Sequence, residues 1–408
     1  MTAPITERRI VFLVGAVQFI NILDFMMVMP LGPDFARNLG FEASRIGLVG
    51  GAYTAAACVA GLIGALFLDR YDRRSALAVA MAGLIAGTAA GGFATNLHTL
   101  MAARVIAGAF GGPATSIALA IIADGVPVER RGKALGAVMG AFAVASVLGV
   151  PAGLEIAAVG GWRAPFFAVA GLGVVIAAAA VALLPPLRDH LGPGGARREQ
   201  APFADLFRRP AVLLSWAMTA SVMLASFSVV PNLSSYFLFN LGYPRKRLGV
   251  LYLVGGTMSF FATRGVGWLV DRYGSFRVGT AGTIWFVGVL YTCFVAPIAG
   301  VPVMAIFLGF MLSNSLRGVP HSALTSRVPA APERARFMSI QSAVQHLASS
   351  LGAFTSAFFL RDLPGGQLEG MPTVASFAIG LALLFPPLAW AVESRVGAPP
   401  PVVAAPTS

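Results

Sequence analysis

An acidic and a basic side chain stand out inside the long apolar runs of this 408-residue sequence. Asp24 follows Arg9 by about 15 residues, which at 1.5 Å per helical residue places it ~22 Å into a ~30 Å apolar layer. Arg104 lies about five residues inside another run, roughly 8 Å from the opposite surface by the same rise. The two depths coincide, so an Asp24–Arg104 ion pair is geometrically possible.

Asp24 is placed where a carboxylate can carry a proton. Burial disfavours a charged carboxylate and a neighbouring guanidinium favours it, so making and breaking the pair with Arg104 would switch proton affinity. Ionisable groups inside a bilayer are costly and rare, which makes each one a functional candidate. The alternative is a permanent ion pair that fixes one helix against another. Gln18 and Asn21 precede Asp24 at helical spacing and lie along the same side.

The second half of the chain has polar candidates in its apolar runs but no acid among them. Together with Gln18 and Asn21 they are the residues that we expect to line the substrate cavity: Asn232, Tyr236, Asn314, Arg317, Gln341, Gln345 and His346. His346 is either a group that titrates near neutral pH or a hydrogen-bonded packing residue. Arg317 lies about 16 residues from one end of its run, so it either contacts the transported molecule or, as we expect, extends its long side chain to water at the other end. Tyr236 is either a ligand contact or an interfacial anchor.

Composition places most of the chain in lipid. Charged residues make up 11% of the sequence and apolar residues 57%, whereas soluble domains have about 25% charged residues. The net charge of +12 is scattered between apolar runs with no basic face, which argues against a nucleic-acid partner. Cys58 and Cys293 both lie inside apolar runs and cannot build a zinc site. No phosphate loop, catalytic carboxylate pair or metal-spaced cluster indicates an enzyme or a cofactor.

Twelve runs are long enough to cross a bilayer, which takes about 20 mostly apolar residues. They are 10–32, 45–68, 75–95, 99–123, 133–156, 163–185, 211–238, 247–269, 277–297, 301–326, 336–360 and 372–393. The sequence therefore predicts an all-α membrane protein that spans the bilayer twelve times.

The longest polar connection divides these runs six and six. We expect a six-helix bundle over 1–185, a flexible cytoplasmic linker over 186–210, a second bundle over 211–394 and a disordered tail over 395–408. About two thirds of the 29 Lys and Arg residues fall on the side that also holds both termini. By the positive-inside rule both termini are expected in the cytoplasm.

Two short motifs recur at half the chain length. Asp69-Arg70-Tyr71 returns as Asp271-Arg272-Tyr273, and Glu129-Arg130 returns as Glu333-Arg334 at nearly the same separation. Two independent matches at one separation indicate that the halves are duplicated and pseudo-symmetric. In a membrane protein such duplication points to a transporter whose halves rock about a central site.

The first copy resembles the signature Gly-x-Leu-x-Asp-Arg-x-Gly-Arg-Arg of the major facilitator superfamily, and the resemblance covers essentially the whole chain. Asp69, Arg70, Arg73 and Arg74 match, while Ala65 and Asp72 replace the two glycines. Arg104-Val-Ile-Ala-Gly108 is similar to the Arg-x-x-x-Gly motif of proton-coupled members. The run from Gly161 to Phe166 is like that of sugar efflux permeases in the 12-span drug/proton antiporter branch. The antiporter motif Gly-Pro-x-x-Gly-Gly reads Val150-Pro151-Ala152-Gly153-Leu154-Glu155 here and lacks its last glycines.

The resemblance implies a monomeric secondary transporter in a bacterial-type inner membrane. It implies proton-coupled efflux of a small drug-like molecule by alternating access, with the proton as coupling ion. An apolar cavity with one carboxylate suits amphipathic or cationic compounds. Symport, or lipid or lysolipid transport by the same fold, remains open, and a membrane receptor or sensor is a more distant alternative.

The resemblance also implies an inner gate among the cytoplasmic loops. Its expected members are Asp69, Arg70, Arg73, Asp124, Asp271 and Arg272. Such acids are expected to contact neighbouring helix ends, where a carboxylate is favoured at the N-terminus, and Arg73 is expected to pair with Asp124. The alternative is that these charges only mark the cytoplasmic side.

Overall fold

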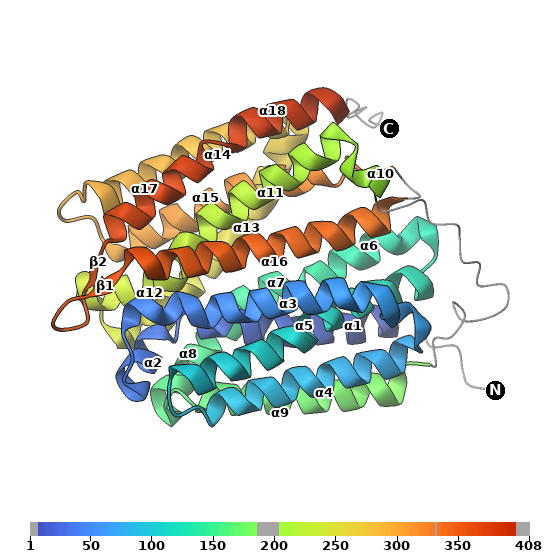
Figure 1. Cartoon of the computed structure of the whole chain (residues 1–408), viewed down its shortest axis with the longest axis horizontal. Coiled ribbons are helices and arrows are strands. Elements are labelled where there is room, and N and C mark those ends of the chain that lie inside the picture. Colours follow the sequence, from blue (N-terminus) through green and yellow to red (C-terminus); the bar gives the residue numbers. More distant parts are fainter. Residues whose placement is uncertain (1–6, 186–203, 331–332, 397–408) are drawn as a thin grey trace, which may run out of the picture.

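A computed structural model describes residues 7–185, 204–330 and 333–396, apart from a few side chains within these ranges. Long helices run side by side along the molecule (Figure 1). Within the described residues the strands are β1 (Arg361–Asp362) and β2 (Leu368–Glu369), which form a small antiparallel hairpin. The predicted all-α class is therefore confirmed. Most of the predicted linker 186–210 and tail 395–408 lies outside the described residues.

Each predicted run in the first half coincides with a helix or an uninterrupted helical series. The elements are α1 (Glu7–Val28), α2 (Gly32–Leu39), η1 (Ala43–Arg45), α3 (Ile46–Phe67), η2 (Leu68–Arg70), α4 (Arg73–Gly92), α5 (Leu97–Gly125), α6 (Val128–Met139), α7 (Ala141–Val144), η3 (Ala145–Gly149), α8 (Val150–Gly160) and α9 (Ala164–Leu183). The series from α6 to α8 forms one span, in which η3 is a π-helical turn just before Pro151. A freed backbone group at such a turn is tolerated where neighbouring helices cover it.

The second half repeats this arrangement. Its elements are α10 (Ala204–Phe207), α11 (Pro210–Val229), η5 (Val230–Asn232), α12 (Leu233–Ser235), η6 (Tyr236–Asn240), η7 (Arg245–Arg247), α13 (Leu248–Tyr273), α14 (Ser275–Leu290), η8 (Tyr291–Val295), α15 (Val303–Thr325), α16 (Arg334–Phe359), the hairpin, α17 (Met371–Ala382) and α18 (Phe385–Val396). The series from α11 to η6 is one long span, as is α14 with η8.

Ten helical segments of the described chain are both long and apolar enough to cross a membrane. Helices α13 and α16, of 26 residues each, complete the twelve by length but are more polar. Arg264 and the Asp271-Arg272 pair lie in α13, and Gln341, Gln345 and His346 lie in α16. Of these residues Gln341 is buried, whereas Arg264, Asp271 and Arg272 are exposed.

The two ends of the molecule differ in what they hold. Helix α1 begins and α18 ends at one end, at the right of Figure 1, which we call the terminal end. Helix α2 and the β hairpin lie at the opposite end, which we call the hairpin end.

The halves meet where α3 lies against α16. Ser350 of α16 donates a hydrogen bond to the carbonyl of Gly51 in α3 (3.0 Å). A Cβ atom added at Gly51 would collide with the ring of Phe354, so only glycine permits this approach. The glycine thus sets how closely the two halves can pack.

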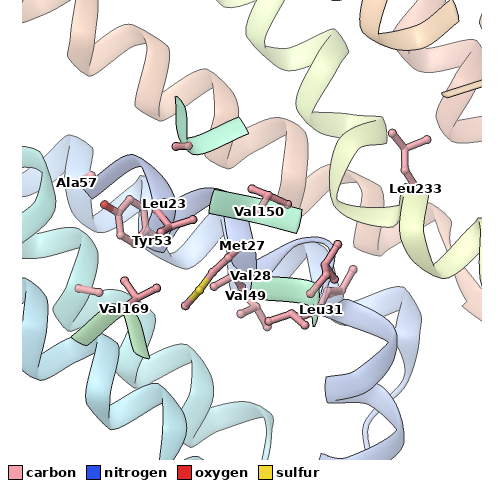
Figure 2. Close-up of a cluster of buried hydrophobic side chains, with 14 of the residues drawn as sticks. Leu23, Met27, Val28, Leu31, Val49, Tyr53, Ala57, Val150, Val169 and Leu233 are labelled. Carbon is pink, nitrogen blue, oxygen red and sulfur yellow. The ribbon is translucent and has the colours of Figure 1, made fainter. Parts of the chain in front are cut away.

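A continuous apolar core surrounds α1. Figure 2 shows Leu23, Met27 and Val28 of this helix among its members, together with Val49 and Tyr53 of α3. Because α1 is packed by α5 and α9 as well as α3, polar side chains on α1 are enclosed in protein. This enclosure positions the site.

Candidate functional site

The carboxylate of Asp24 lies at the centre of the first half, where it meets the guanidinium of Arg104. The Nη2 and Nη1 atoms of Arg104 donate to the two carboxylate oxygens, at 2.5 and 3.1 Å. Asp24 is 0% exposed and Arg104 is 1% exposed. Two parallel bonds between a fork and a carboxylate are the strongest geometry for such a pair. The structure therefore brings together the two residues that the depth argument matched.

Two further side chains hold this pair in place. The hydroxyl of Thr88 in α4 donates to Asp24 Oδ1 (2.7 Å) and also to the carbonyl of Leu84 (2.8 Å). The ring of Tyr53 in α3 lies 5.1 Å from the Arg104 guanidinium carbon, a cation–π contact. Four helices thus contribute to one charged centre, because each places a single residue at the same depth.

Asn21 joins the charged centre to the rest of α5. Its Oδ1 accepts from the Tyr53 hydroxyl (2.7 Å), and its Nδ2 donates to the Gly111 carbonyl (2.8 Å) and the Thr115 hydroxyl (2.6 Å). Gln18 is buried one turn away, and its Oε1 has no hydrogen-bond partner among the described residues. The predicted polar side of α1 therefore faces α3 and α5 within the bundle.

Sequence reasoning missed Thr88, Tyr53 and Thr115. One signal was available in the Arg-x-x-x-Gly motif. A Cβ added at Gly108 would collide with the carbonyl oxygen of Tyr53, so this glycine lets α3 lie directly against α5. The close approach brings the Tyr53 ring beside Arg104, one turn before the glycine.

The second half contains a network of neutral polar side chains around one hydroxyl group, that of Thr219. Thr219 Oγ1 of α11 lies 2.8 Å from His321 Nε2 of α15 and accepts from Gln341 Nε2 of α16 (2.6 Å). It also donates to the carbonyl of Ser215 (2.9 Å). All four residues are buried or nearly so. This neutral network ties α11, α15 and α16 together, and the sequence did not indicate Thr219 as one of its members.

Arg317 lies in the same half and corrects one expectation. The sequence predicted that its side chain would reach water, yet it is 1% exposed. Its guanidinium carbon lies 4.3 Å from the centre of the Phe286 ring. None of its three nitrogens has a hydrogen-bond partner among the described residues. The prediction was wrong because α15 turns this residue toward the bundle interior.

The remaining predicted cavity residues do not gather at one point. Asn314 accepts from Ser226 of α11 (3.0 Å). Asn232 is buried, bonds only weakly to Ser228 (3.4 Å), and leaves its Oδ1 without a described partner. The Tyr236 ring packs on Phe294, with centroids 5.1 Å apart. Two partly exposed side chains of α16 complete the set without a recorded hydrogen bond: Gln345 and His346.

The predicted inner-gate charges lie at the terminal end, and the contacts recorded among them stay within one half. Arg73 bonds to Asp124 (3.3 Å), as the sequence predicted. Asp271 is exposed, and Arg272 lies over aromatic rings of its own helix at 5.4 and 5.6 Å. Arg70 is exposed, and the side chain of Asp69 lies outside the described residues.

Helix-end carboxylates are present near this gate, although on other residues than the sequence indicated. The Asp72 carboxylate accepts from the backbone N–H of Arg74 at the start of α4 (3.2 Å). Glu393 accepts from the first N–H groups of α14, those of Ser275 and Phe276, at 3.1 and 3.3 Å. An anion is favoured at a helix N-terminus, so each half fixes the start of one helix here.

At the hairpin end the recorded polar contacts cross between the halves. Arg245 of η7 forms a fork on Asp34 of α2, with bonds of 2.6 to 3.0 Å. Asp362 of β1 accepts from the backbone N–H groups of Ala43 (2.6 Å) and Ser44 (2.8 Å) at the start of η1. These two contacts, which we call the hairpin-end ties, join the halves. No motif or spacing in the sequence indicated these ties.

Chemically, the described side chains can exchange protons but are not arranged to hold a metal. No group of three or more His, Cys, Asp or Glu in the described part of the chain is close enough to bind a metal ion. The first half contains a neutralised acid–base pair in a dry environment. The second half contains an isolated cation beside a neutral network.

Comparison with known proteins agrees with this arrangement. Residues 14–353 match the family model of the Major Facilitator Superfamily. A chloramphenicol resistance protein of Streptomyces lividans is 28% identical over 262 residues, which cover 64% of this chain and 67% of the relative. The inner membrane transport protein YdhP of Escherichia coli O157:H7 is 28% identical over 370 residues, covering 87% and 89% of the two chains.

Solved structures share the fold at low sequence identity. A bacterial homologue of the human lysosomal transporter Spinster, in an inward-facing and unoccupied conformation, gives a TM-score of 0.78 at 16% identity, covering 98% of this chain and all of that one. A D-xylose–proton symporter gives 0.76 at 16% identity, covering 97% and 98%.

Proposed function

The chain belongs to the major facilitator superfamily, and from this premise we propose that it exports a small, amphipathic or drug-like molecule in exchange for protons. It is a multi-pass inner-membrane transporter and not an enzyme. Family membership leaves open the direction of transport, the coupling ion and the class of cargo, and the proposal concerns these three. Export is supported by the drug-resistance relative and by the resemblance of the motifs to those of efflux permeases.

The observation that carries proton coupling is the buried Asp24–Arg104 pair. Asp24 is the acid of the described chain that lies deep inside a spanning helix, fully enclosed and bonded to a cation. A proton on Asp24 would cancel its charge and release Arg104, whereas loss of the proton restores the pair. A group whose pairing depends on its protonation can link proton movement to a change of conformation.

The hairpin-end ties support alternating access. Asp34–Arg245 and Asp362 hold the halves together at the hairpin end. We infer that the described state is closed outward, with the termini in the cytoplasm. Opening outward then requires these ties to break and the inner-gate charges to meet across the halves.

The test is pH-driven flux in proteoliposomes that contain the full chain. Asp24→Asn keeps the size and hydrogen bonding of the side chain but cannot release a proton. We expect an imposed pH gradient to drive flux through the wild type and not through Asp24→Asn, while uncoupled exchange of the same cargo continues. Chloramphenicol is a suitable first cargo to test, because the relative from Streptomyces lividans is a chloramphenicol resistance protein.

The matched control is Glu42→Gln, which removes an exposed carboxylate of the same half that lies outside the inner gate, next to Arg45. Its pH-driven flux is expected to remain coupled. Wild-type-like coupling in Asp24→Asn would exclude Asp24 as the proton carrier, and His346 would then be the next candidate. Import with the proton gradient, instead of exchange against it, would make the protein a symporter.

A further inference from the structure

Arg317 is a buried cation without a described counter-ion. A guanidinium has five N–H donors arranged as a planar fork, and here Nε, Nη1 and Nη2 all lack a hydrogen-bond partner among the described residues. The Phe286 ring covers one face of the group at 4.3 Å. A cation–π contact leaves the N–H edge unsatisfied, and a buried charge is costly unless it is both paired and hydrogen-bonded.

The surroundings of Arg317 are polar but contain no described acid that pairs with it. Asn314 and His321 lie three residues before and four after it on α15, and both contact hydroxyls of α11. Residues at this spacing share a side of a helix, so Arg317 lies on the stripe of α15 nearest α11. Gln341 Oε1, which belongs to the same polar network, also lacks a described partner. The acids of this half with described side chains lie at helix or strand ends: Asp271, Glu333, Asp362, Glu369 and Glu393.

We propose that Arg317 anchors an anion-binding site inside the second half, and that its ligand is a planar oxyanion. The fork of a guanidinium matches two coplanar oxygens, as in a carboxylate or nitrate. The hydroxyl and amide groups on the same side of α15 are neutral, so they do not compete with the guanidinium for the charge of such an ion.

The charge balance of the two halves supports this assignment. Asp24 neutralises Arg104 in the first half, so the enclosed charges there cancel, whereas Arg317 leaves the second half with one positive charge. Asp24 is also bonded on both oxygens and cannot receive a cationic molecule in this state. In this state the enclosed positive charge of the second half therefore favours a negatively charged group.

The anion has two possible sources with the same chemistry. It is either a free inorganic ion that stabilises the bundle or the carboxylate of the transported molecule, and in the second case the inference rests on the proposed function. Sodium nitrate represents the first source and sodium benzoate the second. Both are planar oxyanions of a single charge.

The experiment measures thermal unfolding of the purified full chain in lipid nanodiscs. Nitrate or benzoate is titrated at constant ionic strength against sodium isethionate, a bulky sulfonate. We expect a saturable rise of the midpoint for the wild type, and at least a tenfold loss of apparent affinity in Arg317→Gln. The control is Arg264→Gln, the same change at an exposed arginine of α13, which is expected to titrate like the wild type.

A wild type without a saturable response to either salt overturns the proposal, whatever the variants do. Equal affinities in the wild type and Arg317→Gln also overturn it. Arg317→Lys keeps the charge without the fork, and it provides the comparison if Arg317→Gln does not fold. The anion affinity of Arg317→Lys is expected to lie between that of Arg317→Gln and that of the wild type. If Arg317→Lys binds as tightly as the wild type, the planar fork is not the group that binds the anion.

Counterflow separates the two sources. Benzoate trapped inside proteoliposomes that accelerates uptake of labelled benzoate identifies a cargo carboxylate, whereas binding without counterflow identifies a free ion. Asp24→Asn is expected to keep the anion response, because it lies in the other half. Loss of coupling in Asp24→Asn with an intact anion response therefore tests the proposed function separately.

Discussion

The two halves of the molecule repeat the same helices but fill their interiors differently. In the first half an acid and a base lie in contact, with Thr88 and Tyr53 bonded around them. In the second half Thr219 joins neutral partners, and Arg317 remains alone among the described side chains. Duplication therefore preserved the packing of the helices and not the polar groups between them. Our two proposals follow this difference: proton exchange in the half with the paired charges, and anion binding in the half with the single charge.

The largest effect is expected from removing one partner of the paired charges. Arg104→Met leaves the Asp24 carboxylate buried with only the Thr88 hydroxyl, and we expect a loss of about 3–5 kcal/mol of stability. The double variant with Asp24→Asn removes both charges and is expected to recover most of that loss. Thermal unfolding in nanodiscs measures both. Equal losses in the single and double variants would mean that the loss does not come from the unpaired Asp24 carboxylate.

Removing the cation of the second half is expected to change the stability in the opposite direction. Arg317→Met replaces an unpartnered charge with an apolar side chain of similar length, so in isethionate the protein is expected to gain about 1–4 kcal/mol. Saturating nitrate should reduce this difference in stability between Arg317→Met and the wild type, because nitrate stabilises only the wild type. If Arg317→Met instead loses as much as Arg104→Met, the two halves have equivalent charged centres and the contrast fails.

How much of this contrast the sequence could predict depends on the geometry of a helix. A fixed rise per residue gives the depth of a side chain, and this sufficed to match Asp24 with Arg104. Depth does not give the direction in which a residue faces, since that depends on how the neighbouring helices pack. The same arithmetic therefore failed for Arg317, which α15 turns inward.

The fold was more accessible than the site for a related reason. Apolar runs of about 20 residues are dictated by bilayer thickness, and each coincides with a described helix or helical series. Thr88 and Thr219 are ordinary polar residues of such helices, and they gain importance only from partners far along the chain. The hairpin-end ties depend likewise on loops that meet only after folding. Resemblance to the superfamily identified the Arg104 motif but not the residues bonded to it.

A smaller and more local test compares two buried threonines on corresponding helices of the two halves. Thr88 in α4 bonds to Asp24 and to its own helix, whereas Thr283 in α14 bonds only to its own helix, at Gly279 (2.9 Å). Both are 1% exposed. Thr88→Val removes a hydrogen bond to a charged group, so it is expected to cost about 1.5–3 kcal/mol more than Thr283→Val in thermal unfolding. Equal losses would show that the carboxylate does not depend on this hydroxyl.

The smallest effect is expected where the halves meet, at the tie between Asp34 and Arg245. The two side chains are 18% and 20% exposed, so solvent weakens their attraction. Arg245→Gln is therefore expected to cost the closed hairpin end about 0.2–1 kcal/mol. Arg247→Gln is the matched control, because it makes the same change in the same η7 turn without a recorded ion pair at this side chain.

The distance between spin labels on exposed residues of the two halves reports this change. Labels at residue 38 of α2 and residue 246 of η7, in a cysteine-free background, flank the tie across the hairpin end. Arg245→Gln should raise the population of long distances by up to about fivefold, the factor that corresponds to about 1 kcal/mol. Because Asp362 still binds the start of η1, the short distance should remain the major one. If Arg245→Gln and Arg247→Gln leave the same distribution, this ion pair does not hold the halves together, and Asp362 alone is left as the tie between them.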